Sequence, residues 1–184
     1  WVGVLCGVIQ VWLAKANNVW LYPFGIVSVL ITCYVLYEAG LYAELLLNIY
    51  YLIMSAYGWV LWVHRRDHPP LQAGYASGRE WGITVLIVAF GFPMLWFALI
   101  RFTDSTVPAW DAWVSATAWA GMWLLAKRKI ENWILLNISN AVAIPLLLYK
   151  NLLLYALLTL FLFIVAIFGY FEWRHQIRQA REAA

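Results

Sequence analysis

The chain has 184 residues, of which 65% are apolar, 18% aromatic and only 11% charged, and its mean hydropathy is +0.76. A soluble domain carries about 25% charged residues, so this composition excludes an ordinary water-soluble globule. The apolar content also excludes disorder, and the only cysteines, Cys6 and Cys33, lie in apolar runs that do not resemble a disulfide scaffold. The net charge of +3 does not indicate nucleic-acid binding, because the basic residues form no contiguous patch. We predict a polytopic membrane protein.

Seven apolar segments are candidates for membrane helices, which need about 20 apolar residues to cross the hydrocarbon. Because the chain opens on Trp1, we expect the N-terminal part of the first segment to be missing from this sequence. No basic region precedes that segment, as one would in a cleaved signal peptide. The fourth segment contains Gly91 and Pro93, which predict a kink or a close helix contact. The segments cover residues 1–13, 19–37, 41–63, 81–100, 112–126, 133–149 and 152–173.

The distribution of Lys and Arg over alternate loops predicts the orientation, because short basic loops stay in the cytoplasm. Only Arg101 and Lys150 fall on one side of the membrane. The C-terminus is therefore predicted to be cytoplasmic. The basic side carries Lys15, Arg65, Arg66, Arg79, Lys127, Arg128, Lys129, Arg174, Arg178 and Arg181.

The longest loop, residues 64–80, is polar, and its Pro and Gly residues predict a flexible cytoplasmic connector. It contains His64, Asp67 and His68, a spacing that a metal site also uses. With Pro69 and Pro70 adjacent, we favour a solvated loop over a metal site. We expect no metal and no cofactor.

The two halves of the chain resemble each other at an offset of about 112 residues. Leu13-Ala14-Lys15 matches Leu125-Ala126-Lys127, and Trp20 matches Trp133. The matches continue in the same order with Tyr42-Ala43 and Tyr155-Ala156, and with Gly58, Trp62 and His64 against Gly169, Trp173 and His175.

These matches predict an all-α integral membrane protein with seven helices in a 3+1+3 parallel repeat. Residues 1–63 form the first three-helix repeat, 64–111 the connector with a linker helix, and 112–184 the second repeat with a short tail. The single linker helix restores the orientation of the second triple, so both triples face the same way. Parallel repeats recur in transporters, whose substrate site lies near the midplane between the halves. A duplicated membrane scaffold or receptor without transport is the alternative.

Amides and aromatic rings form two stripes on predicted helices. At 100° per residue, Trp133, Asn137 and Asn140 share one face of the sixth helix, and a second stripe follows the third helix. Such amides often only hydrogen-bond neighbouring helices, but together with the Trp119 and Trp123 pair they favour a binding cavity. The predicted substrate-binding residues are Asn48, Tyr51, Ser55, Trp59, Trp119, Trp123, Trp133, Asn137 and Asn140.

The chemistry of these groups predicts binding rather than catalysis. The segments contain no Ser/His/Asp set, Cys/His pair or carboxylate dyad at a common depth, so we expect no enzyme. No charged residue lies centrally in a segment, which argues against ion coupling. Asp111, just before the fifth segment, is interpreted as a helix N-cap. Aromatic rings and amides suit a flat, hydroxyl-bearing ligand that is neutral or weakly cationic.

Several stretches resemble the Pnu-type family of vitamin transporters over nearly the whole chain. They are Trp20 through Tyr22-Pro23 to Gly25-Ile26, Leu41-Tyr42-Ala43-Glu44, Ser55-Ala56-Tyr57-Gly58-Trp59 with Trp62, Pro108-Ala109-Trp110-Asp111, and Arg128-Lys129-Ile130-Glu131-Asn132-Trp133 followed by Asn140. Two positions depart from the family pattern, since Leu136 replaces a frequent Trp and Asn48 a frequent Gln.

The resemblance implies a fold like that of the SWEET sugar transporters, in a bacterial inner membrane. It implies facilitated diffusion of nicotinamide riboside, which a cytoplasmic kinase then traps by phosphorylation on the way to NAD. It also implies a homo-oligomer, in the form of a trimer. Members of the same family carry riboflavin, thiamine or deoxynucleosides, and these remain alternative substrates.

Overall fold

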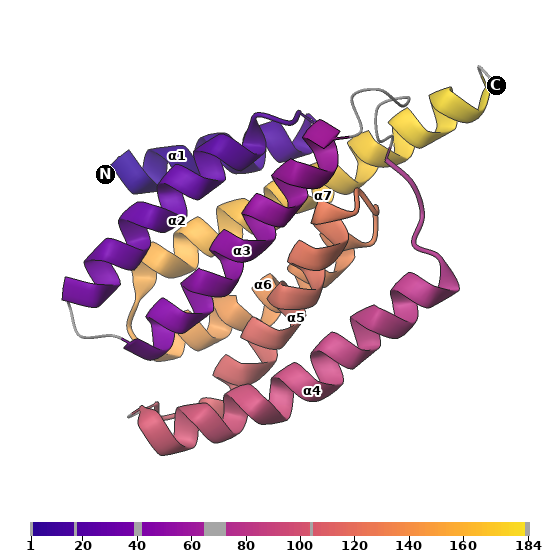
Figure 1. Cartoon of the computed structure of the whole chain (residues 1–184). Helices are drawn as coiled ribbons and strands as arrows, with labels where there is room; N and C mark the ends of the chain where they lie inside the picture. Colours follow the sequence, from indigo (N-terminus) through magenta and orange to yellow (C-terminus); the bar gives the residue numbers. More distant parts are fainter. Residues whose placement is uncertain (1, 17, 39–41, 65–72, 104, 183–184) are drawn as a thin grey trace.

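The computed structural model describes all residues except 1, 17, 39–41, 65–72, 104 and 183–184 (Figure 1). The described part of the chain is all-helical, and its single β-type contact is an isolated bridge between Gly74 and Lys129. Its helices are α1 (Val2–Lys15), α2 (Leu21–Glu38), α3 (Tyr42–His64), α4 (Gly78–Phe102), α5 (Pro108–Ala126), α6 (Asn132–Tyr149) and α7 (Leu153–Glu182).

Six of these helices form a ring. Going round it, α1 packs on α2, α2 on α3, α3 on α5, α5 on α6, α6 on α7, and α7 on α1. Helix α4 lies outside the ring, along α5, with a smaller contact to α3 (Figure 1). The first three helices therefore meet the last three at two seams, α3 with α5 and α1 with α7.

The two seams are closed by the same interaction. The indole Nε1–H of Trp62 on α3 donates to the carbonyl oxygen of Ala126 at the end of α5, over 3.2 Å. The indole Nε1–H of Trp173 on α7 donates to the carbonyl oxygen of Ala14 near the end of α1, over 3.1 Å. Both indoles are buried. Each bond satisfies one of the last carbonyls of a helix, which have no partner within the helix itself.

Each of these indoles packs edge-on against a second aromatic ring, and a glycine lies against that second ring. Tyr22 meets Trp62 with ring centroids 4.9 Å apart, and Trp133 meets Trp173 at 5.6 Å. Gly58 lies against the Tyr22 ring and Gly169 against the Trp133 ring. In this cluster Tyr22 occupies the place that corresponds to Trp133, whereas Trp20, which the sequence had paired with Trp133, is 61% exposed.

Two further kinds of contact occur once in the first three helices or at their seams and again in the last three. The Ser28 hydroxyl on α2 donates to Gly3 O on α1 over 2.8 Å, and Ser139, 111 positions later, donates to Val114 O over 2.7 Å. Across the seams, Lys15 Nζ lies 5.4 Å from the Phe168 ring and Lys127 Nζ lies 5.4 Å from the Tyr57 ring. The same small set of interactions therefore holds α1 to α2 and α5 to α6, and also joins the halves.

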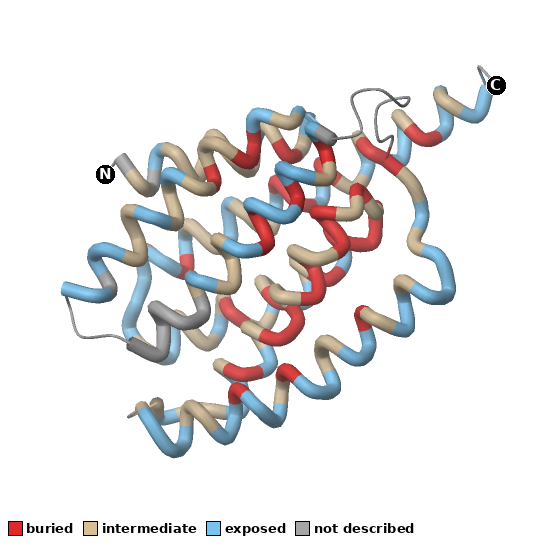
Figure 2. Tube along the Cα trace, viewed as in Figure 1, coloured by how far each residue is buried: buried red, intermediate tan, exposed pale blue. Residues whose placement is uncertain are grey.

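The largest buried cluster lies at one end of the ring, where α1, α3 and α5 end and α2 and α6 begin. Its most deeply buried members include Leu21, Ile130, Trp133 and Trp173. Figure 2 shows buried residues concentrated in α5, α6 and the adjoining parts of α3 and α7, while α4 is largely exposed. Exposed apolar side chains on α4, such as Phe90 and Phe97, suit a hydrocarbon environment.

Three described helices have the length and apolar character to cross a membrane: α4 over Gly78–Phe102, α6 over Asn132–Tyr149, and α7 over Tyr155–Glu182. Leu5–Lys15 and Leu21–Val35 are shorter apolar helices. Helix α4 begins at Gly78, three residues before the predicted start, because the Ser77 hydroxyl accepts from the Glu80 N–H in a capping box. Helix α7 extends past the predicted residue 173 to Glu182 through a polar stretch.

The connector after α3 is attached to the second half in its described part. Gly74 N–H donates to Arg128 O, and Ile130 N–H donates to Gly74 O. The Ala76 N–H donates to both carboxylate oxygens of Glu131, at 3.0 and 2.9 Å. The flexible connector that the sequence predicted is therefore pinned over residues 73–77, and His64, Asp67 and His68 have side chains outside the described residues.

The interpretation of Asp111 as an N-cap was wrong. Helix α5 is preceded by Val107, which makes no side-chain cap, and Asp111 lies inside the first turn. Its carboxylate accepts from the Ser105 hydroxyl at 2.5 Å and pairs with Lys150 Nζ at 2.7 Å. This ion pair ties the beginning of α5 to the end of α6, because the carboxylate meets a cation that the α6–α7 loop brings to the same surface.

The contact between Gly169 and Trp133 gives a stability prediction. A Cβ at residue 169 would lie 2.7 Å from the Trp133 ring, and the ring cannot withdraw because it is buried against Trp173. We expect Gly169→Ala to lower the free energy of unfolding by about 1–3 kcal/mol through overpacking. Thermal unfolding in detergent measures the change. In the control Gly82→Ala on α4, the Cβ meets nothing within 4 Å, so stability should hold or rise. Equal behaviour of both variants would contradict the prediction.

Candidate functional site

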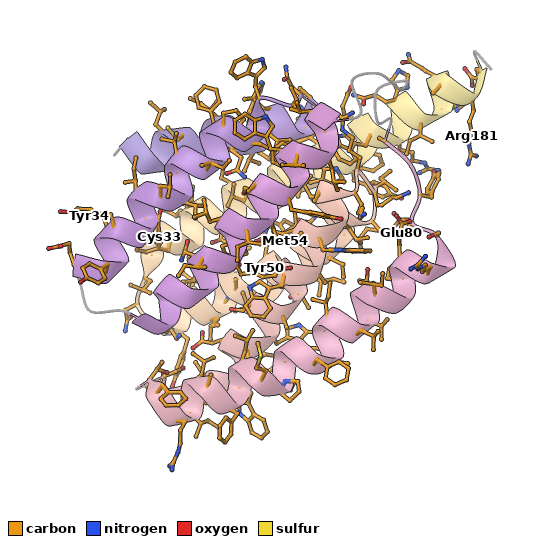
Figure 3. The ribbon with its side chains drawn as sticks, in the orientation of Figure 1. Cys33, Tyr34, Tyr50, Met54, Glu80 and Arg181 are labelled. Atoms are coloured by element: carbon orange, nitrogen blue, oxygen red, sulfur yellow. The ribbon has the colours of Figure 1, made fainter. Side chains whose placement is uncertain are left out.

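An aromatic pair lies at the seam between α3 and α5. The Tyr50 ring stacks on the Trp119 ring with centroids 4.5 Å apart and 30° between the planes. The Tyr50 hydroxyl donates to the carbonyl oxygen of Trp119 over 3.1 Å. On the other side, Gly91 of α4 approaches the same indole, since a Cβ there would lie 3.5 Å from it. Figure 3 shows Tyr50 and Met54 on the part of α3 that faces α5.

The predicted residues of α3 are spread over different surroundings. Tyr51 meets Tyr50 edge-on at 6.1 Å, and Asn48, one turn earlier, is half-buried. Ser55 is only 1% exposed, whereas Trp59 is 42% exposed. Of this stripe, Asn48, Tyr51 and Ser55 therefore lie against protein, and Trp59 is exposed.

The two predicted tryptophans of α5 both lie toward the linker helix. Trp119 belongs to a cluster that includes Phe92, Leu95 and Leu99 of α4. Trp123 is half-buried and packs in a second cluster with Ile87 and Val88 of α4. Their spacing along the helix places them on one face, as predicted, and this face meets α3 and α4.

Two of the predicted residues of α6 lie toward α7. Trp133 and Asn137 line a groove of about 370 Å³ between the two helices. Asn140 continues this stripe and is half-buried. The rim of the groove is apolar and exposed, and its remaining lining residues are Ile134, Ile138, Ala141, Ile167, Tyr170 and Phe171. The structure thus brings Tyr51 and Trp119 together around Tyr50 at the α3–α5 seam, and Trp133 and Asn137 together at the α6–α7 groove. It does not bring Trp59 or Trp123 into either group.

Buried polar atoms in both groups have no hydrogen-bond partner among the described residues. They are the indole Nε1–H of Trp119, the indole Nε1–H of Trp133, and the amide Oδ1 of Asn137. Most buried polar groups in proteins are paired, and each exception calls for a specific explanation such as a bound ligand or water. Two donors and one acceptor of this kind are what a ligand with a carboxamide and hydroxyl groups would use.

Arg128 lies at the deeply buried end of the ring, in the loop between α5 and α6. Its guanidinium lies over the Trp62 ring, 3.2 Å from the centroid, and the side chain is 8% exposed. Its backbone has φ 54°, a left-handed conformation that lets the chain turn sharply from α5 into α6. Burial lowers the pKa of Arg128 to about 10, so the group stays charged at neutral pH and makes a cation–π contact with the seam tryptophan.

Sequence reasoning missed two rings that the structure makes central, Tyr50 and Tyr22. Tyr50 lies next to Tyr51 and outside the helical stripe that was drawn through Asn48 and Ser55. Tyr22 had a detectable signal, since Trp62 and Gly58 lie 111 positions before Trp173 and Gly169, and the same offset places Tyr22 opposite Trp133. Among the described residues, no group of three metal-ligating side chains occurs.

Comparisons with known proteins identify the family. The nicotinamide mononucleotide transporter family matches residues 1–175. A protein of Escherichia coli K12 named nicotinamide riboside transporter PnuC is 22% identical over 208 residues, covering 98% of this chain and 85% of the relative. A Neisseria mucosa protein of the same name is 27% identical over 154 residues, covering 78% of this chain and 56% of the relative.

A solved structure agrees with the fold. The crystal structure of the vitamin B3 transporter PnuC matches with a TM-score of 0.76 and 24% identity, over 97% of this chain and 81% of that chain. The family match extends over far more than half of the chain and includes all seven described helices except the end of α7. The chain therefore belongs to the nicotinamide mononucleotide transporter family.

Proposed function

We propose that this protein carries nicotinamide riboside across the membrane by facilitated diffusion. The observation that carries the proposal is the family match over residues 1–175, together with relatives named nicotinamide riboside transporters. The chemistry of the candidate groups supports it, because stacked rings suit the pyridinium ring and amides suit the carboxamide and the ribose hydroxyls.

The proposed path runs through the ring of six helices, and the site uses residues from both halves. Trp119 and Tyr50 would receive the aromatic ring, with Asn48 and Ser55 on the same helix as Tyr50. Asn137, Asn140 and Trp133 would supply polar contacts from α6. Trp59 and Trp123 stay outside this proposal, since the first is 42% exposed and the second packs beside α4.

The positions of the charged groups support passive transport. The three described ion pairs, Lys150–Asp111, Lys129–Glu80 and Arg178–Glu182, all lie at helix ends. Ion-coupled pumps usually need ionisable groups inside the membrane. We therefore propose a uniporter. We also propose that phosphorylation retains the substrate in the cell, and that the protein lies in a bacterial inner membrane with a cytoplasmic C-terminus.

We further propose that the fold is a 3+1+3 parallel repeat in which α4 is the linker. The recurring contacts support it, above all Ser28–Gly3 and Ser139–Val114 at an offset of 111, and the two seam indoles. In this arrangement a pseudo-two-fold axis through the centre of the ring would relate α1–α3 to α5–α7. It would exchange the α3–α5 seam with the α7–α1 seam. The homotrimer implied by the family resemblance stays a prediction.

Uptake into proteoliposomes tests the function directly. Vesicles that contain the purified protein and no ion gradient should accumulate labelled nicotinamide riboside to the external concentration, faster than protein-free vesicles. Thiamine, riboflavin and a deoxynucleoside are tested as competitors in the same assay. Failure of uptake, a strict requirement for a proton or sodium gradient, or stronger transport of a competitor would reject the proposal.

The indole N–H of Trp119 gives a sharper test of the site. Trp119→Phe keeps an aromatic ring against Tyr50 and removes a buried donor that has no partner among the described residues. We expect stability to change little and nicotinamide riboside binding to weaken by about 1–2 kcal/mol, roughly 5- to 30-fold. Tyr50→Phe is the matched control for the pair, because it removes the hydroxyl bond to Trp119 O and should affect stability more than binding. Quenching of tryptophan fluorescence reports affinity, and unchanged affinity in Trp119→Phe would remove this donor from the site.

The amide of Asn140 gives an independent test on α6. Asn140→Ala should weaken nicotinamide riboside binding by about 1–3 kcal/mol, because a polar group of the ligand loses its partner. Gln179→Ala removes an exposed amide near the end of α7 and should leave affinity unchanged. If Asn140→Ala lowers only the unfolding temperature, the side chain serves helix packing.

A further inference from the structure

A basic groove lies where α7 leaves the bundle. It has a volume of about 370 Å³ and is lined by Tyr75, Phe171, Arg174, His175, Ile177, Arg178 and Arg181. The three arginines are spaced by four and three residues, which places them on one helix face. The ring of Tyr75, from the pinned connector, lies beneath the Arg181 guanidinium at 5.5 Å. None of the described lining residues carries a carboxylate.

The described charges around the groove are mostly positive. Glu182 is the acid that contacts it, through a 2.9 Å pair with Arg178, and both side chains are mostly exposed, at 79% for Arg178 and 64% for Glu182. An exposed ion pair of this kind contributes little to stability, so another anion can easily replace the Glu182 carboxylate beside Arg178. His175 contacts Gln179, and Arg174 is exposed. Figure 3 shows Arg181 on the part of α7 that extends beyond the other helices.

The length of α7 determines where the basic groove lies relative to the membrane. Helix α7 has 30 residues, about 45 Å at 1.5 Å per residue, whereas the hydrocarbon core measures about 30 Å. The last ten or so residues therefore reach the headgroup region and the water beyond it. This places Arg174 and Arg178 at the level of lipid phosphates.

The basic groove continues into an apolar one. Phe171, which is 58% exposed, also lines the α6–α7 groove, whose rim includes the exposed Ile134, Ile138 and Ile167. At Ala141 this groove adjoins a further hollow of about 430 Å³ along α6, lined by apolar residues such as Val142 and Leu146. A positive headgroup site thus opens onto an apolar channel that runs along the outer face of α6.

We propose that this surface binds an anionic phospholipid, with its phosphate between Arg174, Arg178 and Arg181 and one acyl chain against the exposed apolar rim of the α6–α7 groove. The Trp133 Nε1 and Asn137 Oδ1 atoms that the proposed substrate would use are buried and are not part of this rim. Basic residues beside a membrane helix attract anionic headgroups, at about 1 kcal/mol for each Lys or Arg near the surface. Free phosphate would use only the basic groove. A second copy of the chain would need acidic residues opposite these arginines.

Native mass spectrometry of the delipidated protein in detergent tests the proposal without reference to transport. Dioleoyl phosphatidylglycerol should bind at least tenfold more tightly than dioleoyl phosphatidylcholine, which has the same chains. The variant Arg174→Gln/Arg178→Gln should lose this preference. The control Arg79→Gln/Arg101→Gln removes the same charge from exposed positions on α4 and should keep it.

Four outcomes would overturn the proposal. One is equal binding of the two lipids, and another is equal loss of preference in both double variants, which would mean that net charge alone matters. The third is displacement of phosphatidylglycerol by glycerol phosphate at equal concentration, which would identify the ligand as the phosphate group without a chain. The fourth is a changed oligomer mass in the Arg174→Gln/Arg178→Gln variant, which would identify the face as an interface between copies. Circular dichroism establishes that each variant is folded, and Arg181→Gln alone provides a milder substitution with the same expected direction.

Discussion

The ring depends on two indole hydrogen bonds. Trp62 and Trp173 each reach across a seam and satisfy a carbonyl near the end of the facing helix, and each bond is buried. Without these bonds, a carbonyl would be left unpaired in an apolar interior, where that loss is costly. Because the two bonds lie at the same end, that end is tightly packed and fixes how the two sets of three helices meet.

The rest of the structure is arranged around this fixed end. Arg128 covers the Trp62 ring, the connector pairs with the α5–α6 loop, and the largest buried cluster fills the space between. Farther along the α3–α5 seam, the Tyr50 ring stacks on the Trp119 ring and its hydroxyl donates to Trp119 O. Binding chemistry in a membrane protein needs polar atoms that the fold itself does not satisfy. Trp119 and Asn137 hold such atoms outside the largest buried cluster, and Trp133 holds one within it.

Much of the architecture was predictable from the sequence, because the number and order of apolar segments depend on hydrocarbon thickness. The predicted segments agree with the helices, but the ends differ where a cap or a polar extension decides them, as at Ser77 and after Trp173. Helical periodicity correctly grouped Trp133 with Asn137 on one face. It could not indicate which neighbouring helix that face meets, since this depends on tertiary packing. Asp111 was misread because its partner, Lys150, is 39 residues away.

The attachment of the connector changes which parts of the chain form one mechanical unit. Glu131 holds Ala76, Lys129 pairs with Glu80 at 3.3 Å, and α4 packs along the length of α5 with little contact to α3. Helix α4 is therefore bound to the helices that follow it, although in sequence it stands between the two triples. Any rocking of one half against the other would move three helices against four, and a spectroscopic probe on α4 would report the motion of α5 to α7.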